Sequence, residues 1–155
     1  MTAESRWGRA GAVAGAVLLV DQVTKALVSN SIALGERRHL LPGVVTLVHA
    51  ENSGVAFSLF TGSEAGVVVL TIVIVGCVLA YFATHLNQRL MWLASGMIVG
   101  GALGNLTDRI RAGAVTDFIK LPAWPAFNLA DASITLGVLV LILILGRGGV
   151  AARTA

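Results

Sequence analysis

Charged residues are scarce in this chain: Asp, Glu, Lys and Arg make up 12% of its 155 residues, whereas 56% of the residues are hydrophobic. A soluble domain usually carries about twice that charged fraction, so the composition excludes the soluble class and indicates a membrane protein. The formal net charge is only +3, which argues against a nucleic-acid partner. The length fits a single polytopic membrane domain over residues 1–155.

Cysteine and metal-binding patterns are also lacking. The single cysteine, Cys77, cannot form an internal disulfide, and its neighbours in IVIVGCVLAYF predict a small buried hydrophobic residue rather than a nucleophile. The three histidines, His39, His49 and His85, show no metal-ligand spacing, and no HExxH motif is present. We therefore expect neither a metal nor another cofactor.

Long apolar runs are what the chain has in abundance. A bilayer core about 30 Å thick requires about 20 helical residues. Four spans place both termini on one side of the membrane. The basic residues then divide five against six between the two sides, which decides no orientation, but seven of the eight acids lie opposite the termini. The expected transmembrane helices cover approximately residues 10–28, 65–84, 90–107 and 129–145.

The first apolar run begins after Arg6 and Arg9, as a cleavable signal peptide would. No convincing small-x-small cleavage site follows it, and a helix continued through residue 28 gives a full span. We therefore expect a retained helix.

About 35 residues separate the first two spans, which is more than a turn within a helix bundle requires. Within them, PGVVTLVHAENSGVAF predicts a strand followed by a tight bend, and AVTDFI in the third loop has the same strand character. The sequence therefore predicts an all-α integral membrane fold of four transmembrane helices, with a small β-platform formed by the first and third loops.

Two polar groups inside the spans have partners at helical spacing. An ionisable side chain at a span centre costs about 2.5 to 3.5 kcal/mol on insertion scales, so such residues need a partner or a purpose. Asp21 and Lys25 are spaced i, i+4 with the acid first, which predicts a structural ion pair whose lysine reaches the membrane interface.

The motif GGALGNLTDR closes the third span. Gly100 and Gly104 form a small-xxx-small face for close helix packing. Asn105, Asp108 and Arg109 lie within one turn and can face a shared cavity. Asp108 and Arg109 fit a local charge pair at the helix end and a substrate contact equally well, whereas the Asn105 amide must find hydrogen-bond partners or water.

Asp117 and Asp131 have no cation at helical spacing and lie among apolar neighbours. If Asp117 points inward from a short strand and Asp131 caps the last helix beside Asn128, the stiff connector LPAWPAF can bring them together. Two adjacent carboxylates cannot both ionise easily, so one supplies an acid and the other a base for amide hydrolysis by water. Alternatively, they are two unrelated aspartates, one of them a helix cap.

Two other functions also stay open. A Ser–Lys nucleophile pair could combine Lys25 or Lys120 with a serine, the candidates being Ser53, Ser58 and Ser133. A four-helix bundle with inward Asp, Asn and Arg side chains could instead be a small transporter or an ion-conducting assembly.

The motifs DQVTK, NSGVAF, GNLTDR, VTDF and FNLAD, in this order over nearly the whole chain, resemble the lipoprotein signal peptidases (signal peptidase II). The resemblance implies an aspartic endopeptidase of the bacterial inner membrane that removes the signal peptide of prolipoproteins just before a diacylglyceryl-modified cysteine. It also implies cytoplasmic termini, an active site near the outer leaflet, and an extracytoplasmic β-cradle. The implied partners are lipid-modified prolipoproteins, membrane lipids and globomycin-type inhibitors, with no nucleic acid.

Carried over by position, the resemblance implies that Asp117 and Asp131 are catalytic. The loop 30–64 becomes the candidate cover over the site, with hinges at Gly43, Gly54 and Gly62. The implied substrate-binding residues are Asn52, Gly54, Asn105, Arg109 and Asn128, of which Asn128 would orient Asp131, and the implied structural support is Asp21, Lys25 and Asp108.

Overall fold

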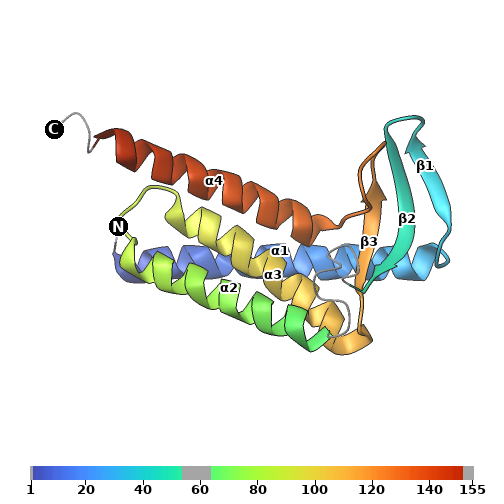
Figure 1. The fold of residues 1–155 in the computed structure, drawn as a ribbon, viewed down its shortest axis with the longest axis horizontal. Coiled ribbons are helices and arrows are strands. Elements are labelled where there is room, and N and C mark those ends of the chain that lie inside the picture. Colours follow the sequence, from blue (N-terminus) through green and yellow to red (C-terminus); the bar gives the residue numbers. More distant parts are fainter. Residues whose placement is uncertain (1, 54–63, 152–155) are drawn as a thin grey trace.

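A helix bundle with a small sheet at one end makes up the computed structural model, which describes residues 2–53 and 64–151. The helices run side by side along the long axis of the molecule (Figure 1). The start of α1 and the end of α4 lie at the end opposite the sheet, as an even number of passes requires. The four helices are α1 (Ala3–Ser31), α2 (Glu64–Thr84), α3 (Met91–Ala112) and α4 (Leu129–Ala151).

Helices occur at all four predicted positions, but they differ in how well they would fit a bilayer. Among the described residues, α1, α2 and α4 are long and apolar enough to cross a membrane, and α3 is not among these candidates. The difference has a packing cause. The buried side of α3 carries small and polar residues, including Ser95, Gly100 and Asn105, because it contacts other helices instead of lipid.

Close packing of α3 depends on its glycines. A Cβ atom on Gly100 would lie 2.6 Å from the Ala14 carbonyl oxygen of α1, and one on Gly101 would lie 2.5 Å from the Ala130 carbonyl oxygen of α4. On Gly104 it would lie 2.6 Å from the carboxylate of Asp21. The small-xxx-small spacing therefore predicts the packing face correctly, and α3 approaches two neighbours at backbone contact.

The sheet joins the first loop to the third. It contains β1 (Arg37–Leu41), β2 (Val45–Asn52) and β3 (Val115–Lys120), antiparallel in the order β1-β2-β3. The strands at β2 and β3 are those the sequence predicts, and β1 adds a hairpin partner. The cluster Val28, Ile32 and Phe118 fastens the sheet to the end of α1.

Two local features set the path of the chain into the site. Gly113 caps α3 in the left-handed conformation (φ 76°), and its amide donates to the Arg109 carbonyl at 3.0 Å. That backbone conformation favours glycine and turns the chain directly into β3. In the register of the sheet, Asp117 on β3 lies opposite Ala50 on β2.

The outer faces of the bundle are apolar and exposed, as on Val69, Ile72 and Val73 of α2. Cys77 is also exposed, so the prediction that it is buried is wrong. The reason is that α2 packs on α3 and presents its remaining surface outward, where a bilayer would cover it.

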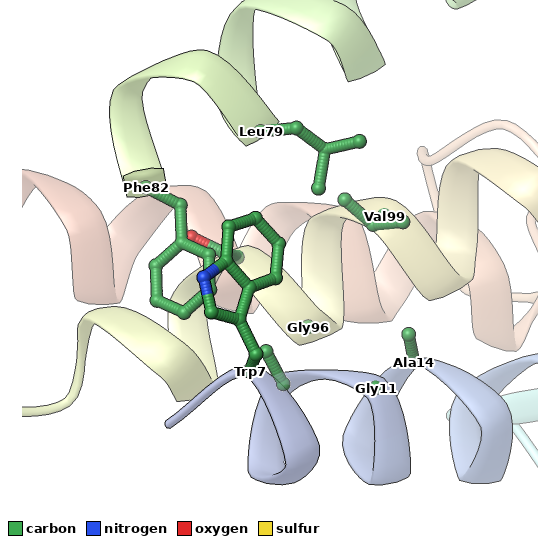
Figure 2. A pocket seen from close by; sticks show the side chains of 9 residues that line it. Trp7, Gly11, Ala14, Leu79, Phe82, Gly96 and Val99 are labelled. Atoms are coloured by element: carbon green, nitrogen blue, oxygen red, sulfur yellow. The ribbon is translucent and has the colours of Figure 1, made fainter. Parts of the chain in front are cut away.

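A small cavity of about 110 Å³ lies between α1, α2 and α3 (Figure 2). Trp7 and Phe82 meet beside it edge to face, with ring centroids 4.6 Å apart. Its wall includes Gly11, which has open space beside it, and Gly96, which lets α3 approach the Ala10 carbonyl of α1. These residues belong to the end of the bundle away from the sheet.

Candidate active site

Asp131 is fixed by the first turn of α4. Because α4 begins at Leu129, Asn128 is its N-cap residue. The Asn128 side-chain oxygen accepts from the Asp131 amide at 2.9 Å, and the Asp131 carboxylate accepts from the Asn128 amide at 3.2 Å. This reciprocal pair is a capping box. Asn128 and Asp131 lie together as predicted, but the prediction that Asp131 caps the helix is wrong: Asn128 is the N-cap, and Asp131 is the third residue of the helix.

Asn128 also holds Asp117. Its side-chain Nδ2 donates to Asp117 Oδ1 at 2.8 Å, and it is fully buried. Asp117 points inward from β3, with only 3% of its surface exposed. One asparagine therefore bonds to the two carboxylates, through its side chain to Asp117 and through its backbone to Asp131, and the tertiary structure brings the two aspartates to the same place.

Two further asparagines orient the pair. Asn105 Nδ2 donates to Asp131 Oδ1 at 2.7 Å, while its Oδ1 accepts from Asn128 Nδ2 at 3.1 Å. Asn52 Nδ2 donates to Asp117 Oδ2 at 3.0 Å from the neighbouring strand. Because Ala50 is the residue opposite Asp117, Asn52 is a diagonal neighbour on the same face of the sheet.

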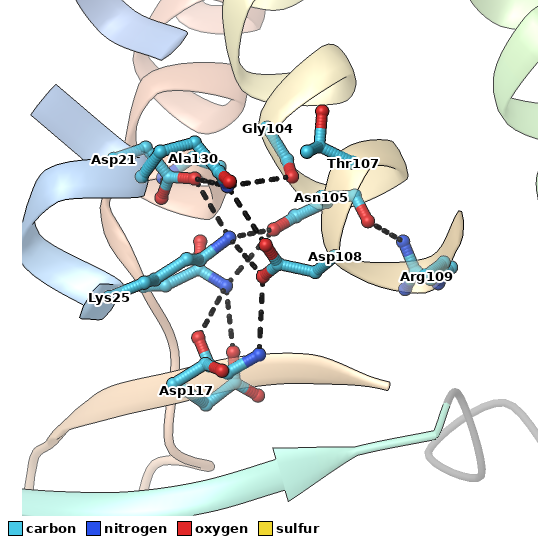
Figure 3. A network of polar contacts seen from close by, with 12 residues as sticks. Asp21, Lys25, Gly104, Asn105, Thr107, Asp108, Arg109, Asp117 and Ala130 are labelled. Carbon is cyan, nitrogen blue, oxygen red and sulfur yellow. Dashed lines mark hydrogen bonds and ion pairs between the residues drawn. The ribbon is translucent and has the colours of Figure 1, made fainter. Parts of the chain in front are cut away.

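A second cluster, centred on Lys25, supports the first (Figure 3). Lys25 Nζ lies 2.8 Å from Asp21 Oδ2 and 2.8 Å from Asp108 Oδ2, and it donates to Asn105 Oδ1 at 2.9 Å. The predicted Asp21–Lys25 ion pair is confirmed. Lys25 is only 4% exposed, so the prediction that it reaches the interface is wrong; three acceptors around it replace the water it would find there.

The Lys25 cluster ties four segments of the fold together, α1, α3, α4 and β3. Asp21 Oδ1 accepts from the Ala130 amide of α4 at 2.9 Å, and Asp108 Oδ2 accepts from the Thr116 amide of β3 at 3.3 Å. Gln22 donates to Asp108 Oδ1 at 2.8 Å. Sequence reasoning gave Gln22 no role, although a polar residue beside Asp21 inside an apolar span was a usable signal.

Asp108 pairs with Lys25, and among the described residues it forms no ion pair with its neighbour Arg109. Arg109 is half-buried, donates to the Asn105 carbonyl at 3.4 Å, and interacts electrostatically with Asp117 and Asp131. The two residues therefore belong to different parts of the site, with Asp108 in the support and Arg109 beside the carboxylates.

Burial raises the pKa of Asp117 from its ordinary value near 3.8 to about 6. The hydrogen bond from Asn52 opposes this shift, the negative charge of Asp131 adds to it, and the hydrogen bond from Asn128 opposes it. Asp117 can consequently exchange a proton close to neutral pH, as a group that works as an acid or a base must.

The Ser–Lys alternative gains no support from the described residues. Lys25 is engaged in ion pairs with Asp21 and Asp108. Lys120 donates to the Trp124 carbonyl, and Ser133 donates to the Met97 carbonyl at 3.1 Å. Ser58 lies outside the described residues.

The remaining sequence predictions concern the first loop and metals. Gly54 and Gly62 lie outside the described residues, whereas Gly43 is in the turn between β1 and β2. Most of the candidate cover before residue 53 is thus a strand hairpin. In the described part of the chain, no group of three or more His, Cys, Asp or Glu side chains is placed to hold a metal ion.

Comparison with known proteins gives a consistent set of similarities. The family model described as signal peptidase (SPase) II matches residues 13–146. The lipoprotein signal peptidase of Halothermothrix orenii is 39% identical over 129 residues, which cover 83% of this chain and 89% of that protein. The lipoprotein signal peptidase of Pelotomaculum thermopropionicum is 40% identical over 126 residues, covering 81% and 83%. A solved bacterial membrane enzyme superposes with a TM-score of 0.83 at 30% identity, covering 89% of this chain and 92% of the other.

Proposed function

Because this chain belongs to the signal peptidase II family, we propose that it removes the signal peptide of lipid-modified prolipoproteins by means of an Asp117–Asp131 pair. Family membership makes it an aspartic peptidase. The observation that carries the residue assignment is the pair of contacts made by Asn128, one to each carboxylate. Among the described residues, no comparable feature favours a transporter.

The proposed division of roles follows from the surroundings of each carboxylate. Asp117 is the member that takes up a proton most readily near neutral pH, since its pKa lies at about 6. Asp131 accepts from Asn105 and from the Asn128 amide, and in the proposed scheme it is the carboxylate that starts without a proton. Ionised Asp131 then draws a proton from water, and the water oxygen attacks the scissile carbonyl while Asp117 donates its proton to the carbonyl oxygen.

The leaving amine needs a proton in the second half of the reaction. Asp131, which gained one from water, returns it to the nitrogen as the C–N bond breaks. At the same time ionised Asp117 takes back the proton of one hydroxyl group of the tetrahedral intermediate, which leaves as the carboxylic acid product. In this scheme no group outside the pair has to ionise. The pair ends with one proton, as it began, and is ready for another cycle.

Substrate contacts are proposed for the residues around the pair. Arg109 lies beside both carboxylates and has guanidinium donors beyond the one directed at the Asn105 carbonyl, so it suits a substrate carbonyl. The amide of Asn105 makes three hydrogen bonds, to Asp131, Lys25 and Asn128, which favours a positioning role. Asn52 is proposed both to position Asp117 and to contact the substrate. Gly54 is proposed as a backbone contact to the substrate on the family pattern alone.

We place the four helices across the bacterial inner membrane, with the termini in the cytoplasm and the carboxylate pair near the outer leaflet. Three helices meet the length and apolarity of a span, and α3, enclosed by the others, crosses with them. A site at the helix ends under the sheet gives a lipid-anchored peptide both an apolar approach and water. Globomycin-type inhibitors are expected to occupy the same site.

The test is cleavage of a diacylglyceryl-modified prolipoprotein by the purified protein in detergent or lipid. We expect Asp117→Asn and Asp131→Asn each to lower the rate at least about 10³-fold, as loss of a catalytic proton donor or acceptor does. Glu51→Gln is the matched control, because Glu51 is an exposed carboxylate on β2, opposite Thr116 in the sheet. It should cut at the wild-type rate.

Each variant is checked for folding by its thermal unfolding in the same detergent. A folded Asp131→Asn variant that still cuts would refute the pair. A wild-type protein that never cuts before the modified cysteine would refute the peptidase assignment itself.

A further inference from the structure

Basic side chains gather at the end of the bundle opposite the carboxylates. Arg6 and Arg9 of α1 and Arg89 of the α2–α3 connection line a pocket of about 330 Å³, together with Trp92 of α3. Glu4 is the only Asp or Glu within residues 1–20, 65–107 and 132–155. The pocket is therefore strongly positive, and the nearby chain supplies little to neutralise it.

Arg6 and Arg9 each have a contact with a neighbour that carries no charge. Arg6 donates to the Leu86 carbonyl and, at 3.3 Å, to Asn87 Oδ1. The Arg9 guanidinium lies 5.7 Å from the centre of the Trp92 ring. A guanidinium has five N–H donors in a planar fork that matches a phosphate. The contacts of Arg6 use one nitrogen and leave the other donors for an anion.

The apolar cavity of Figure 2 lies on the same faces of α1 and α3 as the basic pocket, closer to the middle of the bundle. On α3, Trp92 of the basic pocket and Gly96 and Val99 of the cavity are spaced i, i+4, i+7. On α1, Arg6 and the cavity residues Ala10 and Ala14 follow at i, i+4, i+8. A charged pocket at the helix ends is thus followed, one to two turns deeper, by an apolar one.

We propose that these two pockets bind one anionic phospholipid, with its phosphate on Arg6, Arg9 and Arg89 and part of one acyl chain in the cavity. An apolar cavity of about 150 Å³ takes a benzene-sized group, so one of about 110 Å³ takes a few methylene groups. Basic pockets between membrane helices bind anionic lipid headgroups in this way, and each basic residue raises the affinity roughly fivefold.

This site is separate from the carboxylate pair in both position and chemistry. It lies at the other end of the helices, and none of its residues belongs to either cluster of the candidate active site. The proposal therefore does not rest on the peptidase assignment, and its test does not use cleavage.

The experiment uses tryptophan fluorescence of the protein in lipid vesicles. Trp7 and Trp92 line the two pockets and Trp124 does not, so the Trp124→Phe variant reports on the site. Vesicles of phosphatidylcholine receive a small fraction of brominated phosphatidylglycerol or, in parallel, of brominated phosphatidylcholine. We expect the anionic lipid to quench at a mole fraction at least about tenfold lower.

Two variants test the two halves of the site. Arg6→Gln/Arg9→Gln/Arg89→Gln should abolish the preference for the anionic lipid, whereas the matched variant Arg37→Gln/Arg38→Gln, at the sheet end, should keep it. Gly11→Leu should fill the cavity and weaken quenching. Gly15→Leu is its control, because Gly15 has equally open space around it and does not line the cavity.

Three outcomes would overturn the proposal. The first is equal quenching by the two lipids in the folded wild-type background, and the second is an unchanged preference in the triple arginine variant. The third concerns the source of the phosphate: if millimolar inorganic phosphate or glycerol phosphate displaces the brominated lipid, the pocket binds free phosphate and the acyl chain plays no part. Helical circular dichroism of each variant establishes that it is folded.

Discussion

The two ends of the helix bundle differ in the surroundings of their charged side chains. At the sheet end, Asp21 and Asp117 are buried and Asp108 and Asp131 half-buried. Each of the four has a donor beside it: Lys25 binds Asp21 and Asp108, and asparagines bind Asp117 and Asp131. At the other end, arginines surround an open pocket with a single acid nearby. Charged side chains that are paired inside the protein fix the geometry that a peptidase site needs. Charged side chains that face an open pocket can bind a ligand.

The largest expected effect comes from breaking the support at the sheet end. Lys25→Met leaves Asp21 and Asp108 buried without their cation, so we expect a loss of about 3–5 kcal/mol in the free energy of unfolding. Thermal unfolding in detergent measures it. Lys120→Met should change little, because within residues 2–53 and 64–151 the bond of this lysine is to a backbone carbonyl at the surface. If the two variants unfolded at similar temperatures, Lys25 would contribute no more to stability than Lys120 does, and the expected difference would be wrong.

The next effect concerns pH and the stability of the sheet end. The raised pKa of Asp117 means that the folded protein keeps a proton between about pH 4 and pH 6 that the unfolded chain has released. This contribution to stability is complete below about pH 4 and is lost as the pH rises through about 6. The difference between a pKa of 3.8 and one of about 6 corresponds to about 3 kcal/mol in the free energy of unfolding.

Asp117→Asn removes this dependence. Its unfolding temperature relative to wild type should therefore rise between pH 4 and pH 8, and Glu51→Gln should show no such trend. A difference between Asp117→Asn and wild type that stays constant with pH would mean that Asp117 titrates at its ordinary pKa.

A smaller effect is expected from helix packing between the two ends. Gly100→Ala puts a Cβ atom 2.6 Å from the Ala14 carbonyl, so α1 and α3 must separate, at a cost of about 1–3 kcal/mol. Gly76→Ala on α2 has nothing within 4 Å and serves as the control. Unfolding of both variants in the same detergent makes the comparison, and equal stability would show that the contact is not tight.

The smallest expected effect concerns the hydrogen bond from Asn52 to Asp117. The Asn52 hydrogen bond lowers the pKa of Asp117, so Asn52→Ala should move that pKa upward while leaving the fold intact. The pH dependence of the cleavage rate reports the change as a shift of the limb near pH 6. A limb that does not move would place Asn52 in substrate binding alone.

Much of the fold follows from local pattern. The apolar runs predict four helices, the β-branched stretches predict β2 and β3, and the i, i+4 spacing predicts the Asp21–Lys25 pair. These succeed because each depends on residues close in sequence. The exposure of Cys77 and the burial of Lys25 were predicted wrongly, since burial depends on which helix packs against which face, and spacing along one helix does not contain that information.

For the candidate site, the sequence by itself determined which residues were candidates: unpaired acids at the edge of apolar runs, and asparagines in motifs that resemble a known family. Only the tertiary structure decided that Asn128 bonds to both carboxylates, that Asp108 binds Lys25, and that Asn52 reaches Asp117 from β2. The physical reason is that these contacts join segments far apart in sequence, and the close approach of helices at glycines and the register of the sheet set their geometry.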